Sequence, residues 1–359
     1  MSAAPVMIVA GGTGGHVFPA LAVAEELRRR RIGVIWVGTR RGLEARIVPA
    51  AGIAMEWIEV RALRGRGLQG WLGAPGMLLR AVWQALRLVA RYRPRVVLGM
   101  GGYVSGPGAL AAWLLRRPLL IHEQNVTAGF TNRLLRRRAR IVMTGFPGIF
   151  AGSAPSVWTG NPVRSEIIGV PVPRLRYAMR RDTPRLLVLG GSQGAEVLNT
   201  VIPAALARLE PAQRPLVRHQ AGQRTVALAR EAYRRHAVAA RVSEFIDAMA
   251  EAYGWADLVV CRAGALTVAE LAVAGVASVL VPFPYATDDH QTANARFLSR
   301  AGAAVLIPEH AFSAQRLSFV LSRLLGDRDR LWVMAQRARQ QGRPQATACV
   351  VRLCLEVAA

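Results

Sequence analysis

Short apolar runs alternate with longer amphipathic stretches along almost the whole chain. This alternation of buried strands with helices is typical of parallel sheets that carry helices on both faces. We therefore expect a first set of strands at Val6–Ala10, Val34–Val37, Met55–Glu59, Val96–Gly99, Leu119–Ile121 and Arg140–Met143.

The alternation stops in a Pro- and Gly-rich passage, residues 146–173, and then resumes. The second set of expected strands is Leu186–Leu189, Leu216–His219, Val242–Glu244, Leu258–Val260, Ser278–Val281 and Ala304–Ile307. Two such sets predict an α/β protein of two doubly wound Rossmann-like domains facing across a cleft. We expect domains at residues 1–162 and 163–342, with a last helix at 343–359 that packs back on the first domain.

Basic residues far outnumber acidic ones, and every one of the 47 is an arginine. The lack of lysine excludes a Walker A loop, a Schiff base and a pyridoxal-phosphate anchor. A net charge of +25 predicts an anionic partner: a nucleic acid, a phospholipid surface or a phosphorylated substrate. Because the sequence holds no RNP, helix-turn-helix or aromatic-interleaved basic motif, we expect no nucleic acid.

Glycine-rich turns follow three of the expected strands, in VAGGTGGH, GMGGYVSGPG and VLGGSQGAEVLN. Such a turn before a helix lets the backbone approach a diphosphate, whose charge the helix N-terminus attracts. None of the three has the G-x-G-x-x-G spacing of a dinucleotide fingerprint. Arg40 and Arg41 follow the second strand and could bind a 2′-phosphate, so an NADP site stays open as an alternative. Another alternative is that the glycines serve only tight packing of helix against strand.

His16 comes directly after the first glycine turn, at the start of the following helix. The positive end of a helix disfavours a second proton on an imidazole there, so the ring stays neutral and can accept a proton. A neutral imidazole beside a phosphate-binding turn suits a general base that acts on a hydroxyl group. The alternative is a structural histidine.

Two further polar groups interrupt apolar surroundings. The segment His122-Glu123-Gln124-Asn125 follows a short buried strand, where sugar hydroxyls would supply hydrogen-bond partners; alternatively, Asn125 caps the next helix. Glu270 lies in the middle of an apolar helix in CRAGALTVAELAVAG. Because an isolated buried carboxylate is costly, we expect it to accept hydrogen bonds from a neighbour or from a ligand, with ribose the natural candidate.

Seven longer motifs occur in order along the chain, within a resemblance that runs from about Val6 to at least Gly302: GGTGGHVFPALAVAEEL, GMGGYVSGPG, HEQN, GNPVR, GGSQGA, CRAGALTVAE and DDHQTANA. In these motifs the chain resembles the bacterial peptidoglycan N-acetylglucosaminyltransferases, which convert lipid I into lipid II. The resemblance implies the GT-B fold of two Rossmann-like domains. It also implies inverting transfer of N-acetylglucosamine from UDP-N-acetylglucosamine to the 4-hydroxyl of lipid-linked N-acetylmuramoyl-pentapeptide.

The resemblance further implies a donor site, mainly in the second domain. Arg164 and Ser192 would face the diphosphate, Ile246 the uracil, Glu270 the ribose and Gln291 the sugar. The helix N-terminus that would also face the diphosphate comprises Ala265, Leu266, Thr267, Val268 and Ala269. The residues expected on the opposite wall, near the donor sugar and the acceptor, are Thr13, Gly14, Gly15 and Asn125, with His16 as the base.

We expect no metal and no cofactor. The only D-x-D sequence, Asp327-Arg328-Asp329, lies between two late amphipathic helices, where helix capping is the expected role. The cysteines, Cys261, Cys349 and Cys354, have no metal-ligand spacing. Arg164 and helix N-termini would then balance the charge of the leaving diphosphate.

An amphipathic stretch at residues 70–95 carries Trp71, Leu72, Met77, Leu78 and Trp83 among arginines. Such a helix suits an anionic membrane surface, to which the basic run RLLRRRAR at 133–140 would add; alternatively, it packs within the first domain. With lipid I as acceptor, we expect a peripheral enzyme on the cytoplasmic face of the inner membrane. Other proteins of cell-wall synthesis stay open as partners.

Four other functions share parts of this pattern. They are a UDP-sugar transferase with another lipid acceptor, a UDP-sugar epimerase, an NADP-dependent oxidoreductase and a non-catalytic membrane-binding module. Release of UDP that depends on a lipid I analogue would distinguish the expected transferase from all four.

Overall fold

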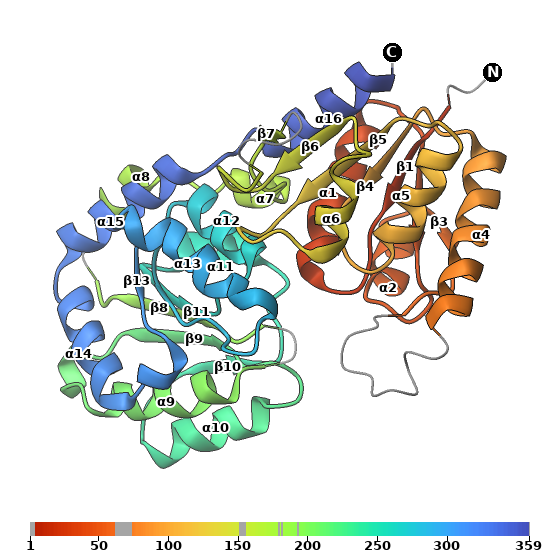
Figure 1. Cartoon of the computed structure of the whole chain (residues 1–359). Coiled ribbons are helices and arrows are strands. Elements are labelled where there is room, and N and C mark those ends of the chain that lie inside the picture. The colour runs from red at the N-terminus through yellow and green to blue at the C-terminus, as the bar shows by residue number, and fades with distance from the viewer. Residues whose placement is uncertain are drawn as a thin grey trace. The chain divides into compact units, whose positions relative to one another are not determined.

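The computed structural model describes residues 4–61, 74–150, 156–178, 180, 182–191 and 194–358. The chain forms two compact units (Figure 1). The first ends at Arg164 and takes in the C-terminal segment from Pro344, and the second is Ser165–Arg343. These divisions lie within two residues of the boundaries expected from the sequence.

A seven-stranded parallel sheet forms the centre of the first unit, in the order β3-β2-β1-β4-β5-β6-β7. In its register Ile8 of the central strand lies between Trp36 and Leu98. Its strands are β1 Val6–Val9, β2 Val34–Gly38, β3 Ala54–Trp57, β4 Val96–Gly99, β5 Leu119–Glu123, β6 Ile141–Thr144 and β7 Ser156–Trp158. The first six confirm the expected set, whereas the edge strand β7 lies in the Pro- and Gly-rich passage and was not expected.

Side chains of β1 alternate between two cores, as the period of a strand requires. Val6 and Ile8 pack with α1 and α16, while Met7 and Val9 pack with α4 and α5 on the other face. This doubly buried strand explains the uninterrupted apolar run in the sequence. The helices of this unit are α1 Gly14–Arg29, α2 Glu44–Ala50, α4 Ala74–Tyr92, α5 Ser105–Leu114, α6 Phe130–Leu135 and α16 Ala346–Ala358.

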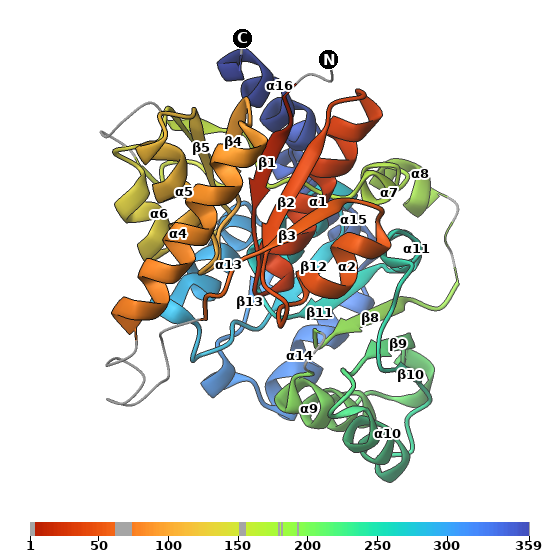
Figure 2. The same cartoon turned by 90° about the vertical axis from the view of Figure 1, so that its right-hand side faces the viewer.

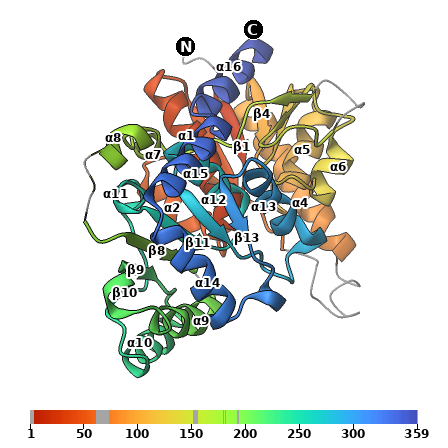
Figure 3. The same ribbon diagram turned by 90° about the vertical axis from the view of Figure 1, so that its left-hand side faces the viewer.

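The second unit repeats the arrangement with a six-stranded parallel sheet of order β10-β9-β8-β11-β12-β13 (Figure 3). Its strands are β8 Arg185–Leu189, β9 Leu216–Gln220, β10 Arg241–Ser243, β11 Leu258–Cys261, β12 Ala277–Leu280 and β13 Ala304–Leu306. All six confirm the second expected set. The strand order reverses beside β8, as it does beside β1 in the first unit, and such reversals are where α/β sheets bind ligands.

Helices also surround the second sheet, and leucines of α9 and α14 fill its larger core. The helices of this unit are α7 Ser165–Ile168, α8 Pro173–Ala178, α9 Glu196–Ala207, α10 Val226–Arg235, α11 Met249–Trp255, α12 Ala265–Ala274, α13 His290–Arg300, α14 Ala314–Leu325 and α15 Arg328–Gln341. In the part of the chain that the structure describes, no helix has both the length and the apolar character needed to cross a bilayer.

Candidate active site

The first glycine turn connects β1 to α1, and a buried carboxylate accepts a hydrogen bond from its backbone. Glu44, at the start of α2, accepts a hydrogen bond from the backbone N–H of Gly12 at 3.0 Å. Its other oxygen accepts from the backbone N–H of Thr39 at 3.0 Å and from the Thr39 hydroxyl at 2.8 Å. The carboxylate is fully buried, and these donors compensate its charge.

The second glycine turn, after β4, packs directly on the first. Gly102 has a φ of +80°, and a Cβ there would come within 2.1 Å of the Gly11 carbonyl oxygen. A Cβ on Gly12 would lie 3.2 Å from the ring of Tyr103, whose hydroxyl is 3.4 Å from that of Thr39. Glycine is therefore required because two backbone turns and an aromatic ring share this space. Neither Glu44 nor Tyr103 was singled out from the sequence.

His16 lies in the first turn of α1, where its backbone N–H donates to the carbonyl of Thr13. Its Nδ1 is 3.2 Å from Oε1 of Gln124, which follows β5. Gly101 leaves the room for this pair, since a Cβ there would be 2.5 Å from Nδ1 of His16. The structure thus places Thr13, Gly14 and Gly15, which precede His16 at the start of α1, near the segment that follows β5.

The polar residues at the end of β5 are buried and paired within the protein. His122 Nε2 is 3.0 Å from the Gly160 carbonyl oxygen, and Glu123 accepts from the backbone N–H of Gly129 at 2.9 Å and from the side-chain amide of Asn132 at 2.9 Å. Protein groups thus supply hydrogen bonds for which sugar hydroxyls were the expected partners. Burial lowers the pKa of His122 to about 4, although the Gly160 carbonyl opposes the shift.

Asn125 is held at the end of this loop by Glu123, which accepts from its backbone N–H at 3.0 Å and from its side-chain amide at 3.4 Å. The alternative role as a helix cap is wrong, because α6 begins at Phe130 and Gly129 occupies the N-cap position. Asn125 is only half-buried, so a ligand can approach it.

Arg164 is the last residue of the first unit, and its guanidinium lies 5.5 Å from the ring centroid of Phe18 on α1. Gly14 packs on the same ring, since a Cβ there would be 3.0 Å from it. The aromatic ring therefore brings the arginine near the first glycine turn, although the two are far apart in sequence.

In the second unit, the N-terminus of α12 and the first turn of α13 are tied together. Gln291 Oε1 accepts hydrogen bonds from the backbone N–H groups of Ala263 at 3.2 Å and Phe283 at 3.0 Å. Asn294, one turn later, donates to the Ala263 carbonyl at 3.2 Å. Gln291 thus lies beside the α12 N-terminus, which runs from Ala265 through Leu266, Thr267, Val268 and Ala269 as expected.

Glu270 lies on α12 and is buried, with an exposed fraction of 5%. Its Oε2 accepts a hydrogen bond from the Tyr253 hydroxyl at 2.9 Å, so the expectation of a donating neighbour is met. Ile246 lies half-buried in the loop between β10 and α11. Ser192, expected at the diphosphate, is outside the described residues.

Both halves of the chain match models of one enzyme family. Residues 6–144 match the N-terminal domain of glycosyltransferase family 28, and residues 185–348 match its C-terminal domain. The chain belongs to glycosyltransferase family 28. Its two Rossmann-like sheets are those of the GT-B fold.

Two named relatives and a solved structure match the chain over nearly its full length. A protein of Alkalilimnicola ehrlichii named UDP-N-acetylglucosamine–N-acetylmuramyl-(pentapeptide) pyrophosphoryl-undecaprenol N-acetylglucosamine transferase is 61% identical over 99% of both chains. A protein of Nitrosococcus oceani with the same name is 56% identical over 98% of both. The crystal structure of MurG from Acinetobacter baumannii is 41% identical and superposes with a TM-score of 0.83, covering 98% of this chain and 99% of its own.

The D-x-D sequence of this family 28 member has the capping role that was expected. The side chain of Asp327 is the N-cap of α15 and accepts from the backbone N–H of Arg330 at 2.9 Å. Within the described ranges, no cluster of three or more His, Cys, Asp or Glu side chains could hold a metal ion.

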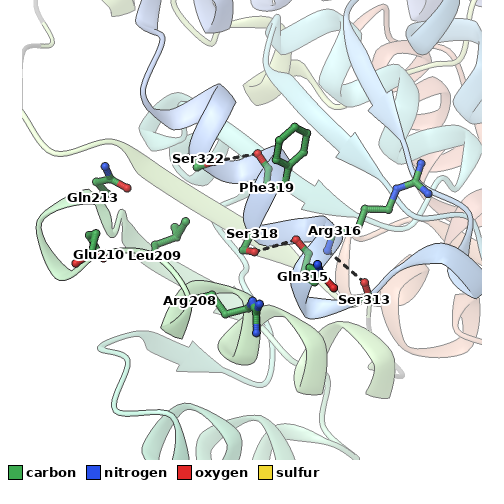
Figure 4. Close-up of a pocket in the computed structure, with 10 residues that line it drawn as sticks. All are labelled: Arg208, Leu209, Glu210, Gln213, Ser313, Gln315, Arg316, Ser318, Phe319 and Ser322. Carbon is green, nitrogen blue, oxygen red and sulfur yellow. Dashed lines mark hydrogen bonds between the residues drawn. The ribbon is translucent and has the colours of Figure 1, made fainter.

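A groove of about 600 Å³ lies on the surface of the second unit, between the end of α9 and α14 (Figure 4). Its polar groups serve the helix itself: Ser313 caps α14 by accepting from the backbone N–H of Arg316, and the Ser318 hydroxyl donates to the Gln315 carbonyl. None of the expected site residues of this glycosyltransferase lines the groove.

Proposed function

We propose that this protein transfers N-acetylglucosamine from UDP-N-acetylglucosamine to the 4-hydroxyl of N-acetylmuramoyl-pentapeptide in lipid I, which gives lipid II. The observation that carries the proposal is the full-length match, at 61% and 56% identity, to two proteins named for this transfer. A histidine that pairs with Gln124 beside the first glycine turn supports the same reaction.

The donor is assigned mainly to the second unit. The α12 N-terminus presents backbone N–H groups at Ala265 and the residues after it, and such groups attract a diphosphate. Arg164 and Ser192 would add to the diphosphate contacts. Since Oε1 of Gln291 already accepts two backbone hydrogen bonds, its amide NH₂ is the group it can offer to a sugar hydroxyl.

Uridine is assigned to the same unit. Glu270 is buried and oriented by the Tyr253 hydroxyl, so its carboxylate is fixed before the ribose hydroxyls arrive. Preorganisation of this kind lowers the entropic cost of binding. Ile246, half-buried between β10 and α11, would border the uracil.

His16 is assigned as the general base of an inverting transfer. It would take the proton of the acceptor hydroxyl while that oxygen attacks the anomeric carbon and UDP departs from the opposite side. Thr13, Gly14, Gly15 and Asn125 would border the reacting sugar and the acceptor. No metal is needed in this mechanism, because Arg164 and the α12 N-terminus supply positive charge to the leaving diphosphate.

Membrane association is assigned to α4 and α6, which flank α5 on one face of the first sheet (Figure 2). On α4, Leu79 is 72% exposed and Trp83 is 55% exposed, while the guanidinium of Arg87 lies 4.7 Å from the Trp83 ring centroid. On α6, Phe130 and Leu134 are exposed.

Exposed apolar side chains beside arginines suit a peripheral contact with an anionic membrane on its cytoplasmic side. Met77 does not belong to this surface, because it packs against the core of the first unit. Trp71 and Leu72, expected on the same surface, lie outside the described residues. Other proteins of cell-wall synthesis would meet the enzyme at this membrane.

The deciding experiment measures UDP release from UDP-N-acetylglucosamine with and without a short-chain lipid I analogue. We expect release that depends on the analogue and yields the disaccharide product, and a diacylglycerol acceptor should give none. The same assay in excess EDTA should proceed at an unchanged rate. Loss of turnover in EDTA with recovery on adding magnesium would contradict the metal-independent mechanism, and release without acceptor would contradict the transferase.

A further inference from the structure

The side-chain amide of Gln124 lies between a backbone carbonyl and the His16 imidazole. Its Nε2 donates to the carbonyl oxygen of Met100 at 2.8 Å, and its Oε1 is 3.2 Å from Nδ1 of His16. Only 1% of Gln124 is exposed. Both ends of the amide therefore interact with groups of the first unit.

These partners determine which way the amide is oriented. A carbonyl oxygen can only accept, so the NH₂ end of Gln124 must be the end that faces Met100. The end that faces His16 is then the amide oxygen, which also can only accept. Nδ1 of His16 must therefore carry the hydrogen, and in a neutral imidazole this leaves the lone pair on Nε2.

The surroundings hold this arrangement in place. The backbone carbonyl of Gln124 accepts from the side-chain amide of the buried Asn161 at 3.0 Å. Gly101 packs against both partners, since a Cβ there would be 2.5 Å from His16 Nδ1 and 3.1 Å from Gln124 Oε1. The Ser105 hydroxyl in turn donates to the Gly101 carbonyl at 2.7 Å. This packing leaves little space for the His16 ring or the Gln124 amide to rotate and break the hydrogen bond between them.

We propose that Gln124 is a positioning residue that fixes His16 as the Nδ1–H tautomer and leaves Nε2 to accept the proton. This inference rests on the proposed role of His16 as the base. In the step, the acceptor oxygen bonds to the anomeric carbon and its proton moves to Nε2. The bond from that carbon to the diphosphate oxygen breaks, and its electron pair leaves with UDP.

Gln124 also acts on the product of the proton transfer. The imidazolium that forms keeps its Nδ1–H directed at the amide oxygen of Gln124, and a hydrogen bond from a charged donor is stronger than one from a neutral donor. The contact therefore strengthens as the base becomes charged. An interaction that is stronger in the transition state than in the ground state raises kcat and leaves donor binding unchanged.

The tautomer can be measured without turnover. In full-length protein labelled with nitrogen-15 at histidine, long-range nitrogen–proton correlations identify the protonated ring nitrogen, and the signal missing from His16→Ala assigns His16. We expect Nδ1–H in the wild type and a larger share of Nε2–H in Gln124→Met, which keeps the side-chain length but removes both polar groups. If His16 of the wild type carries its hydrogen on Nε2, the role of Gln124 is overturned, while the proposed transferase function is not.

Kinetics test the consequence of the tautomer. Gln124→Met should lower kcat by about 10-fold while the donor KM changes by less than about twofold. The control is Tyr92→Phe, which removes one side-chain hydrogen bond to Glu56 in the same unit and should keep the wild-type kcat. Wild-type kcat in Gln124→Met would overturn the positioning role. Wild-type kcat in His16→Ala would instead overturn the proposed base and, with it, the catalytic part of this inference.

Discussion

The carboxylate of Glu44, at the start of α2, accepts a hydrogen bond at 3.0 Å from the backbone N–H of Gly12, in the turn after β1. Three donors converge on this one side chain, two of them from Thr39. A side chain with an N–H or O–H group at this position would place that donor against one of the three donors that now point at the carboxylate. The first glycine turn is therefore held by a buried side chain 32 residues away in the sequence.

Glu44→Gln should lower the free energy of unfolding by about 2 kcal/mol, because its NH₂ group would face an N–H or O–H that needs an acceptor. Urea denaturation measures this change. The exposed Glu59, which pairs with Arg80, provides the matched variant Glu59→Gln, and its stability should remain that of the wild type. Equal stability of the two variants would show that the Gly12 contact is dispensable.

His16→Ala should lower kcat by roughly 10²–10⁴-fold, the range for a positioned proton acceptor. Donor KM should change little, because the backbone of Thr13, Gly14 and Gly15 remains. Steady-state kinetics at saturating donor and acceptor measure both quantities, with the exposed His310→Ala as control. A His16→Ala enzyme that binds donor poorly but turns over normally would make His16 a binding residue.

Glu270→Ala should raise the donor KM by about 10- to 100-fold, since hydrogen bonds to a charged acceptor contribute about 1.5–3 kcal/mol. The kcat at saturating donor should fall much less. Isothermal titration with UDP reports the same loss independently of turnover. Glu251→Ala removes an exposed carboxylate of the same unit that pairs with Arg218, and unchanged affinity is expected there. If both variants bind UDP equally well, Glu270 does not contact the nucleotide.

The free energy of unfolding should decrease as the pH falls, and part of this decrease should come from the buried His219. Burial lowers the pKa of this side chain to about 3, whereas the unfolded chain keeps a value near 6.5. The unfolded state therefore binds more protons below pH 6.5, and the stabilisation present above that pH is lost as the pH falls. His219→Gln should reduce the decrease in unfolding free energy between pH 7 and pH 5 by about 2 kcal/mol.

Urea denaturation at the two pH values measures the His219 effect. The exposed His310→Ala should retain the wild-type pH dependence. The buried His122, whose pKa is about 4, acts in the same direction and remains in both variants. Identical pH dependence in all three proteins would mean that His219 is not buried as a neutral imidazole.

Leu79→Glu and Trp83→Glu on α4 should weaken binding to vesicles of anionic phospholipid, because each places a negative charge on an exposed apolar position. A flotation assay measures the bound fraction. The exposed Phe319→Glu, on α14 of the second unit, is the control and should float as the wild type does. Turnover with a water-soluble acceptor analogue should stay normal in all three. Undiminished flotation of both α4 variants would place the membrane contact elsewhere.

The central strands could be predicted from the sequence because their apolar runs, such as those of β1 and β11, are buried on both faces of a parallel sheet. β7 could not, since it lies in the Pro- and Gly-rich passage where the alternation of apolar runs and helices stops. Its residues lack the continuous apolar character that burial on both sides gives to β1 and β11.

Candidate site residues could be proposed from the sequence where they lie within one continuous motif, as His16 and the residues of α12 do. The supports of the site could not, because their partners are distant in sequence: Glu44 reaches Gly12, Gln124 reaches His16, and Phe18 lies against Arg164. Sequence periodicity identifies the buried face of a helix but not which polar atoms meet. The segment at the end of β5 shows this limit, since sugar hydroxyls were the expected partners, whereas Glu123 accepts hydrogen bonds from Asn125, Gly129 and Asn132.

Helix α16 packs against α1 and β4, so the last helix completes a core that the first strand begins. On a ribosome, β1 therefore emerges long before its final packing partner, and the whole of Ser165–Arg343 is made in between. The first unit therefore keeps part of its apolar surface uncovered until the whole second unit has been made. Removal of α16 should thus destabilise β1 and α1, which are translated first.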